Sequence, residues 1–173
     1  QQNILVVGAG FMGAGIAQVC AQSGYRVHLS DVNPQALGKA EKGLQWSVNK
    51  LADKGLLEEG SDTILDRLTY ENDLSSAPGA DWIIEAVLEV ETLKIDLFKA
   101  LEKEIPATTP LATNTSSIPI TRMAAHLNRP ERMLGLHFFG PVPFMGLVEV
   151  VKGKQTSDTV FEAGIAFVSS LGK

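Results

Sequence analysis

The spacing of apolar residues changes from strand-like to helical within the first dozen positions of the chain. Residues 4–7 are continuously apolar and mostly β-branched, which is typical of a parallel strand buried on both faces. Apolar residues then recur at helical spacing over residues 11–23, and Gly24 follows. The pattern predicts a first strand, a helix that ends at a C-terminal glycine, and a second strand over the alternating segment 26–30 (RVHLS).

The same alternation of strand and helix periods continues to the C-terminus. It predicts further strands over residues 68–70, 82–85, 111–113, 133–136 and 147–151. The predicted helices between the second strand and residue 68 are a long one from Pro34 to about Lys54, with Asn33 as N-cap, and a short one capped by Ser61 or Asp62 that carries Ile64, Leu65 and Leu68. The later helices are one with an apolar face of Leu93, Leu97, Leu101 and Ile105, one over residues 118–127, and a last one from Ser157 or Asp158 to about Leu171. We therefore expect an α/β fold with a doubly wound, mainly parallel Rossmann-type sheet, in one domain over residues 1–173. The two helices between Pro34 and Leu68 exceed a simple crossover and predict an extra helical hairpin.

The turn after the first strand has the sequence GAGFMG over residues 8–13. In a dinucleotide site, Gly8 permits the tight turn, Gly10 lets the backbone approach a pyrophosphate, and Gly13 lets the helix pack closely on the strand. The backbone of Ala9, Phe11 and Met12 would line the same phosphate site at the helix N-terminus. Glycine turns are common, so an ordinary strand–helix turn is the alternative; the order of strand, glycines, helix, strand and acid favours the dinucleotide site.

Asp31 is the acid that follows the second strand, about twenty residues after the glycines. A carboxylate at this place holds a ribose 2′-hydroxyl and repels a 2′-phosphate, whereas a basic residue would attract one. The residues after Asp31 are Val32, Asn33 and Pro34, without a base. The expected cofactor is NAD rather than NADP.

Composition limits the class of protein further. The chain has 45% hydrophobic and 20% charged residues and a net charge of −5, which fits a folded domain and argues against a nucleic-acid surface. No apolar run is long enough for a membrane span. The single cysteine, Cys20, excludes an internal disulfide and favours a reducing compartment, for which we expect the cytoplasm. We expect no metal site.

A second group of polar residues follows the later strands. His137 comes directly after the strand expected over 133–136, where a neutral imidazole could act as a general base. Glu149 lies inside the apolar segment LVEVV, where a carboxylate is costly without a partner. A His–Glu pair would satisfy the carboxylate and orient the ring. The alternative is a structural histidine and an outward-facing glutamate on an edge strand.

Two further polar sets have ordinary explanations from the residues alone. The segment from Asn114 to Ser117 is typical of a loop and helix cap. Lys50 and Lys54, on the helical hairpin, are expected to be solvated, although a phosphate-bearing ligand could use either.

Together these segments resemble the NAD-binding domain of the L-3-hydroxyacyl-CoA dehydrogenases, which include the 3-hydroxybutyryl-CoA dehydrogenases. The matching segments are GAGFMGAGIAQ (8–18), the strand end at Asp31, IIEAVLE (83–89), TNTSSIPIT (113–121) and LGLHFFGPVPFMGLVEVV (134–151). The resemblance implies NAD-dependent oxidation of an L-3-hydroxyacyl-CoA to the 3-oxoacyl-CoA, or the reverse reduction, as in fatty acid β-oxidation.

The resemblance also implies roles for individual residues. His137 matches the base that takes the 3-hydroxyl proton, Glu149 the carboxylate that pairs with it, and Ser116 a hydroxyl near the substrate oxygen. The positions that it assigns to the cofactor, besides residues 8–13 and Asp31, are Glu89, Lys94, Asn114, Ser116 and Gly140. Ser47 and Lys54 match positions that contact coenzyme A, so that the helical hairpin would carry the CoA.

The chain departs from the family in two respects. Gly140 stands where the family usually has Asn in a HFFNP-like segment, which predicts weaker orientation of the substrate or a different acyl preference. The family's C-terminal helical domain, which closes over the acyl-CoA and forms a homodimer, is absent, so we expect the chain alone to bind NAD(H) but to turn over poorly. Two other readings stay open: a dehydrogenase of a free hydroxy acid or sugar acid, and a catalytically silent NAD-binding module.

Overall fold

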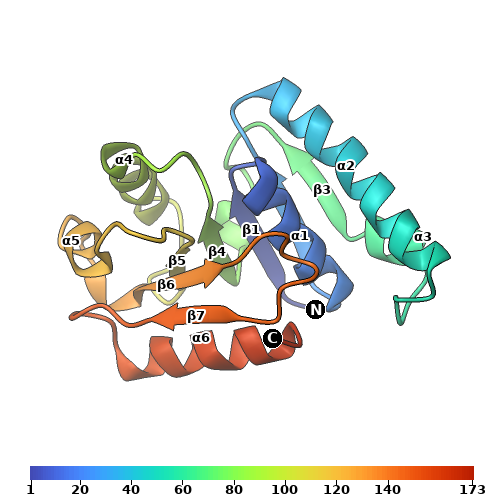
Figure 1. The fold of residues 1–173 in the computed structure, drawn as a ribbon. Helices are drawn as coiled ribbons and strands as arrows, with labels where there is room; N and C mark the ends of the chain where they lie inside the picture. Colours follow the sequence, from blue (N-terminus) through green and yellow to red (C-terminus); the bar gives the residue numbers. More distant parts are fainter.

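The computed structural model describes all of residues 1–173 and contains one seven-stranded sheet (Figure 1). Its strands are β1 (Asn3–Val7), β2 (Arg26–Ser30), β3 (Leu68–Glu71), β4 (Trp82–Glu85), β5 (Leu111–Thr113), β6 (Met133–Phe138) and β7 (Val148–Val151). The spatial order is β3-β2-β1-β4-β5-β6-β7, and every pair is parallel except β6 and β7. This order is that of a doubly wound dinucleotide-binding sheet with one antiparallel edge strand, so the predicted fold class is confirmed.

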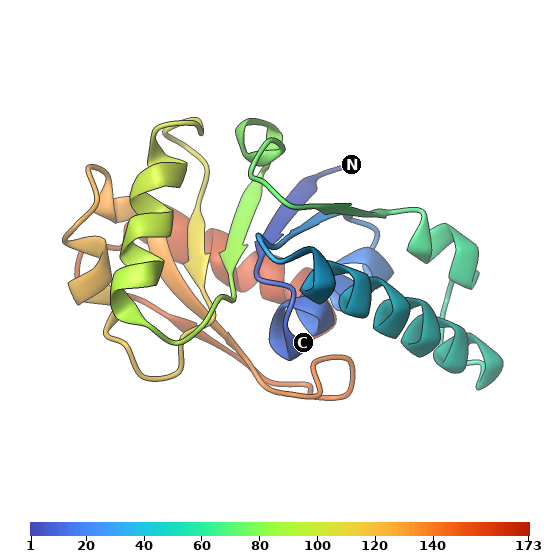
Figure 2. The same cartoon turned by 90° about the horizontal axis from the view of Figure 1, so that it is seen from above.

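Helices cover both faces of the sheet (Figures 1 and 2). They are α1 (Phe11–Gln22), α2 (Pro34–Asp53), α3 (Ser61–Leu65), α4 (Glu91–Glu102), α5 (Ile120–Ala124) and α6 (Asp158–Ser170), with two short 3₁₀ turns at Ala77–Gly79 and Pro130–Arg132. The residues of β1 alternate between the two cores. Ile4 and Val6 join the larger core beneath α1, α2 and α6, whereas Leu5 and Val7 join the smaller core beneath α4 and α5.

The two helices predicted between β2 and β3 form the expected hairpin. The Asn33 side chain caps α2 by accepting hydrogen bonds from the backbone N–H groups of Gln35 and Ala36. The long α2 runs beyond the sheet to α3, as Figure 2 shows. The cap of α3 differs from the prediction, because Gly60 begins it without a side-chain hydrogen bond and Leu68 belongs to β3.

Two other helices are shorter than predicted. The helix expected over 118–127 is the five-residue α5, which ends in tight turns after Ala124. The helix α4 ends at Glu102 and buries Lys94, Phe98 and Leu101, while Leu93 is 44% exposed. The predicted apolar face is correct at Leu101 and Ile105, which are buried, and at Leu97, which packs against the smaller core. It is wrong at Leu93, because the buried face at the start of the helix is formed by Lys94, which the sequence pattern counts as polar.

The strand β6 is longer than predicted and includes His137, which was expected to follow it. The extra length comes from antiparallel pairing with β7, which continues to the Phe138–Val148 pair.

None of the helices combines the length and the apolar character that crossing a bilayer requires. Nowhere do three His, Cys, Asp or Glu side chains meet in an arrangement that could hold a metal ion.

Candidate functional site

The glycine turn lies at the point where the sheet order reverses, between β1 and β4. Chain connections leave β1 and β4 toward opposite faces here, which opens a crevice at the carboxyl ends of the strands. Gly8 has φ +108°, a conformation that residues with a Cβ rarely adopt, and an added Cβ would overlap the backbone of Ala86 in the loop after β4. Gly8 therefore allows both the turn and the close approach of the neighbouring loop.

The two other fingerprint glycines have the different environments that a phosphate site requires. A Cβ at Gly13 would collide with the carbonyl of Gly8, so this glycine allows the helix to pack against the turn. A Cβ at Gly10 would meet nothing within 4 Å, and no side chain caps α1. The first N–H groups of α1, at Phe11, Met12 and Gly13, are thus free to bind an anion. The residues present fit a dinucleotide pyrophosphate.

Asp31 lies at the same edge, directly after β2. One carboxylate oxygen accepts a hydrogen bond from the N–H of Ala9 at 2.9 Å, and the other accepts from the N–H of Asn33 at 2.9 Å. These bonds join the acid to the glycine turn and hold it in place. Asp31 is only partly buried, and its contact with a ribose hydroxyl stays a prediction.

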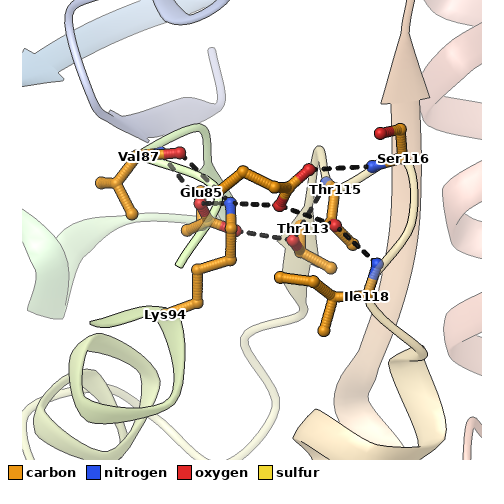
Figure 3. A network of polar contacts seen from close by, with 8 residues as sticks. Glu85, Val87, Lys94, Thr113, Thr115, Ser116 and Ile118 are labelled. Atoms are coloured by element: carbon orange, nitrogen blue, oxygen red, sulfur yellow. Dashed lines mark hydrogen bonds and ion pairs between the residues drawn. The ribbon is translucent and has the colours of Figure 1, made fainter. Parts of the chain in front are cut away.

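A buried ion pair fixes the loop after β4 (Figure 3). Glu85 is fully buried, and its carboxylate accepts hydrogen bonds from Lys94 Nζ at 2.5 Å, Thr113 Oγ1 at 2.6 Å and the N–H of Val87 at 2.8 Å. Lys94 is 2% exposed and also donates to the carbonyl of Val87. The lysine, which the resemblance assigns to the cofactor, thus has its ammonium held inside the protein and shapes the loop beside the crevice.

Glu89 extends this network to the loop after β5. Its carboxylate accepts hydrogen bonds from the Thr115 hydroxyl at 2.8 Å and from the N–H of Ser116, and it lies 3.4 Å from Lys94 Nζ. Partial burial alone would raise the pKa of Glu89, but the hydrogen bond from Thr115 and the charge of Lys94 outweigh it and lower the pKa below its ordinary value of 4.5. The carboxylate stays charged and positions Ser116.

Ser116 and Asn114 lie on the loop that leaves β5. Ser116 is exposed, with its hydroxyl free of protein partners. The side-chain oxygen of Asn114 accepts a hydrogen bond from the N–H of Phe138 at 2.8 Å, which ties this loop to the end of β6 next to His137. The structure therefore brings Asn114, Ser116, Glu89 and His137 to one edge of the sheet.

His137 and Glu149 are directly opposite each other across the antiparallel pair of β6 and β7. The His137 Nδ1 and a Glu149 carboxylate oxygen are 2.9 Å apart, and the Phe139 ring lies 4.5 Å from the imidazole. The predicted pair is present. Because Glu149 engages Nδ1, the remaining ring nitrogen, Nε2, is left for another partner.

The burial of this pair differs from the expectation. The side chain of Glu149 is 54% exposed, whereas that of His137 is 20% exposed. The carboxylate was expected to be costly inside an apolar strand, but β7 is the edge strand and Glu149 faces outward between inward-facing neighbours. Both alternatives of the sequence analysis hold in part, since the glutamate is outward-facing and also pairs with the histidine.

Gly140, which follows β6, lies against the glycine turn. A Cβ at this position would be 2.6 Å from Cε1 of Phe11 and 3.1 Å from the Met12 sulfur. The Phe11 ring, which is 71% exposed, occupies the space next to Gly140 and would have to move for any larger residue there.

The positions that resemblance assigns to coenzyme A lie on α2. Ser47 lines an open cavity of about 600 Å³ that is bordered by α1, α2 and the loop after Gly140. Lys54 is the exposed C-cap of the same helix, seven residues further along. Sequence reasoning missed the cavity and two of its aromatic residues, Trp46 and Phe144. It also gave no role to Glu85 or Thr113, whose only local signal is a polar residue at a strand end.

Comparison with known proteins identifies the family and supports the fold. The family model described as the NAD-binding domain of 3-hydroxyacyl-CoA dehydrogenase matches residues 3–173. A probable 3-hydroxybutyryl-CoA dehydrogenase from Deinococcus radiodurans is 42% identical over 97% of this chain. The chain spans 60% of that relative's length.

Solved structures agree with this assignment. A crystal structure of 3-hydroxybutyryl-CoA dehydrogenase from Escherichia coli is similar over 99% of this chain and 37% of its own, with a TM-score of 0.96 and 42% identity. A 5-formyl-3-hydroxy-2-methylpyridine 4-carboxylic acid 5-dehydrogenase, an NAD⁺-dependent dismutase, has a TM-score of 0.88 at 32% identity and covers 99% of this chain and 55% of its own. The chain belongs to the 3-hydroxyacyl-CoA dehydrogenase family and represents its NAD-binding domain.

Proposed function

We propose that the protein is an NAD-dependent dehydrogenase that converts an L-3-hydroxyacyl-CoA to the 3-oxoacyl-CoA, or catalyses the reverse reduction. The observation that carries this proposal is the His137–Glu149 pair, 2.9 Å apart, at the same edge of the sheet as the glycine turn. Relatives with this activity in their names support the choice of substrate.

The oxidation of a secondary alcohol requires a base for the hydroxyl proton and an acceptor for the hydride. In the proposed reaction, His137 Nε2 takes the proton from the 3-hydroxyl group as the carbonyl forms. Glu149 holds the ring through Nδ1 and stabilises the imidazolium by its charge. NAD⁺, which the glycine turn and Asp31 would hold, would supply the hydride acceptor for C3. Ser116, which Glu89 positions, would donate a hydrogen bond to the substrate oxygen.

The test is His137→Ala in the full-length protein, with NADH oxidation by acetoacetyl-CoA as the assay. General-base assistance is worth on the order of 10²- to 10⁴-fold, and we expect a loss of about that size in kcat. The affinity for NADH, measured by calorimetry, should stay nearly constant because His137 does not belong to the glycine turn. A parallel collapse of NADH affinity would identify His137 as a structural residue and refute the proposed role.

A second candidate is a dehydrogenase of a free hydroxy acid or sugar acid. The family likeness to an enzyme named for a pyridine carboxylic acid favours it, as does Gly140, which offers only backbone groups to a substrate. Competition between acetoacetyl-CoA and the free 3-keto acid for the full-length protein decides between them. A failure of both compounds to oxidise NADH would favour a catalytically silent NAD-binding module.

We further propose that the rest of the protein includes a helical domain that covers this edge and forms a homodimer. Glu149 is half exposed, and the loops that follow β4 and precede β7 carry the exposed apolar residues Leu88, Phe144 and Leu147. Light scattering of the full-length protein tests the dimer, and a monomer that turns over normally would contradict it.

We also propose a reducing compartment such as the cytoplasm, which suits the buried, unpaired Cys20. Cell fractionation tests this location.

A further inference from the structure

The loop between β6 and β7 connects the two members of the His137–Glu149 pair. It covers residues 139–147, after the strand that carries His137 and before the strand that carries Glu149. Val142 is its single buried residue, at 2% exposed, whereas three other apolar side chains of the loop are exposed: Phe144, Met145 and Leu147. Apolar burial therefore holds this loop at one point only, although it connects the two residues that the proposed reaction needs.

That point lies against α1. Gly15 lets Val142 pack directly on the helix, because a Cβ at position 15 would lie 2.9 Å from the Val142 Cβ. The loop also borders the open cavity, to which α1 and α2 contribute Gln18 and Trp46. A shift of the loop would therefore change the edge of the sheet at which cofactor and substrate are expected to meet.

A lysine at the end of α6 provides a second anchor for the loop. Lys173 Nζ donates hydrogen bonds to the backbone carbonyls of Val142 at 2.8 Å and Met145 at 2.6 Å. No other side chain of the structure hydrogen-bonds to residues 139–147. Both views of the fold place the C-terminal end of the chain next to this loop (Figures 1 and 2). The ammonium thus joins two carbonyls, three residues apart, and fixes the turn between them.

The sequence at the end of α6 directs this lysine toward the loop. Gly172 has φ +74°, a conformation that favours glycine. Its N–H donates to the carbonyl of Ser169, and the N–H of Lys173 donates to the carbonyl of Val168, which is the Schellman arrangement of a helix C-terminus. The chain turns at Gly172, so that the helix cap sets the position of Lys173.

The surroundings of the ammonium are unfavourable for a cation that serves the helix alone. Lys173 takes part in none of the ion pairs of the chain, and burial lowers the pKa of its ammonium below the ordinary 10.5. A lysine can interact with the dipole at a helix C-terminus while it stays in water. The two loop carbonyls therefore account for the position of this side chain better than the helix does.

We propose that Lys173 is a positioning residue for the reaction at His137. Its ammonium fixes the loop, and the loop fixes the ends of β6 and β7, from which His137 and Glu149 face the substrate. This role rests on the proposed oxidation of a 3-hydroxyacyl-CoA and adds a residue that contacts neither member of the pair. A small displacement of the base has a large effect, because the reacting atoms must lie about 3–3.5 Å apart.

The main test is Lys173→Met in the full-length protein, since methionine keeps an unbranched apolar side chain and removes the donors. We expect kcat with acetoacetyl-CoA to fall on the order of tenfold, while the dissociation constant of NADH stays within about twofold. With NADH deuterated at the transferred position, the isotope effect on kcat should rise, because hydride transfer is the step that slows. Lys173→Arg keeps a cationic donor and should restore most of kcat.

A double-variant cycle tests whether Lys173 acts through the base. Lys173→Met should lower kcat far less in the His137→Ala background than alone, because a misplaced base and an absent base affect the same step. Lys152→Met is the matched control, since Lys152 pairs with Asp158 at the other end of α6. It should leave kcat and the isotope effect unchanged.

A further variant displaces the same loop with Lys173 in place. Gly15→Ala moves Val142 away from α1, so it should lower kcat and raise the isotope effect even if Lys173→Met does not fold. Equal losses of kcat from Lys173→Met in both backgrounds, or an unchanged isotope effect in Lys173→Met and Gly15→Ala, overturn the positioning role and leave the proposed function intact. A wild-type protein that does not reduce acetoacetyl-CoA refutes the proposed function itself.

Discussion

Two acid–base pairs lie at the same edge of the sheet in contrasting environments. Glu85 and Lys94 are 0% and 2% exposed and lie 2.5 Å apart at the end of the central strand β4. Glu149 and His137 are 54% and 20% exposed and lie 2.9 Å apart on the edge pair of β6 and β7. The first pair is closed off from any substrate, and the second is open to one.

The difference in burial separates a structural role from a chemical one. The Glu85 carboxylate accepts hydrogen bonds from three protein donors, so that a change in its charge or its position would lower the stability of the fold. The His137 ring has one partner on Nδ1 and a free Nε2. The central pair therefore builds the rigid wall of the crevice, and the edge pair can exchange a proton with a bound ligand.

The largest expected effect is the loss of one partner from the central pair. Lys94→Met leaves the Glu85 charge buried without its cation, which should cost about 3–5 kcal/mol in the free energy of unfolding. Urea unfolding of the chain measures this cost. The double variant Glu85→Gln/Lys94→Met removes both charges and should recover most of the stability, because a buried pair contributes little net stability beyond satisfying itself.

An exposed pair that contacts the same helix provides the control. Arg122 Nε lies 2.6 Å from Glu91, the first residue of α4, but its side chain is 59% exposed. Arg122→Met should change the unfolding free energy far less than Lys94→Met, because water replaces a surface partner. Equal losses in the two variants would show that burial does not distinguish the central pair.

The second prediction compares two glycines, one at the central turn and one at the edge. Gly13→Ala places a methyl group against the fixed carbonyl of Gly8, whereas Gly140→Ala meets the exposed and movable ring of Phe11. Overpacking of a rigid site costs about 1–3 kcal/mol or more, and we expect this for Gly13→Ala, together with a loss of NADH affinity. Gly140→Ala should cost less than about 1 kcal/mol.

A second substitution at Gly140 tests the role of this position in orienting the substrate. Gly140→Asn, which restores the usual family residue, should fit better in the Phe11→Leu background than alone, because the smaller side chain vacates the space that the amide needs. Thermal unfolding and the ranking of acyl-CoA chain lengths are the measurements. Unchanged turnover and ranking in both backgrounds would contradict a role of position 140 in orienting the substrate.

The succession of strands and helices along the chain and the doubly wound fold class could be predicted from the sequence, because strand and helix periods alternate and the glycine fingerprint marks the first turn. The boundaries failed where tertiary contacts override the local pattern. Lys94 counts as polar in any periodicity, yet the central pair buries it and shifts the buried face of α4. His137 was placed after its strand, because only pairing with a second strand twelve residues away extends β6.

The site was predictable to a different degree in its two parts. The glycine turn and Asp31 follow from local spacing, and the His137–Glu149 pair could be suggested from an acid inside an apolar strand. The roles of Glu85 and Thr113 depend on three segments that meet only in the folded chain. Gln18, Trp46 and Phe144 come from two helices and a loop, and no spacing in the sequence relates them.

The third prediction concerns the charge of the edge pair. Glu149→Gln keeps an oxygen that can accept a hydrogen bond from Nδ1 but removes the negative charge that stabilises the imidazolium. We expect kcat of the full-length protein to fall about tenfold, since a hydrogen bond to a charged group exceeds a neutral one by roughly 1–1.5 kcal/mol, while urea unfolding stays nearly unchanged at this exposed position. A large loss of stability with normal turnover would show that the His137–Glu149 pair has a structural role, like the pair of Glu85 and Lys94.

The smallest effect is a pH dependence at Glu89, which lies between the two pairs. Its pKa is below the ordinary 4.5 in the folded chain, so its contribution to stability is present above pH 4.5 and is lost as the pH falls through the lower folded value. Glu89→Gln should therefore lose slightly less stability between pH 6 and 3 than the unsubstituted chain does, as measured by urea unfolding at each pH. Glu58→Gln, at an exposed carboxylate without a partner, is the control and should follow the unsubstituted chain. If Glu89→Gln loses as much stability as the unsubstituted chain over this pH range, the contacts with Thr115 and Lys94 do not stabilise the charged Glu89 carboxylate. The stabilising network of the central pair then does not extend beyond Glu85.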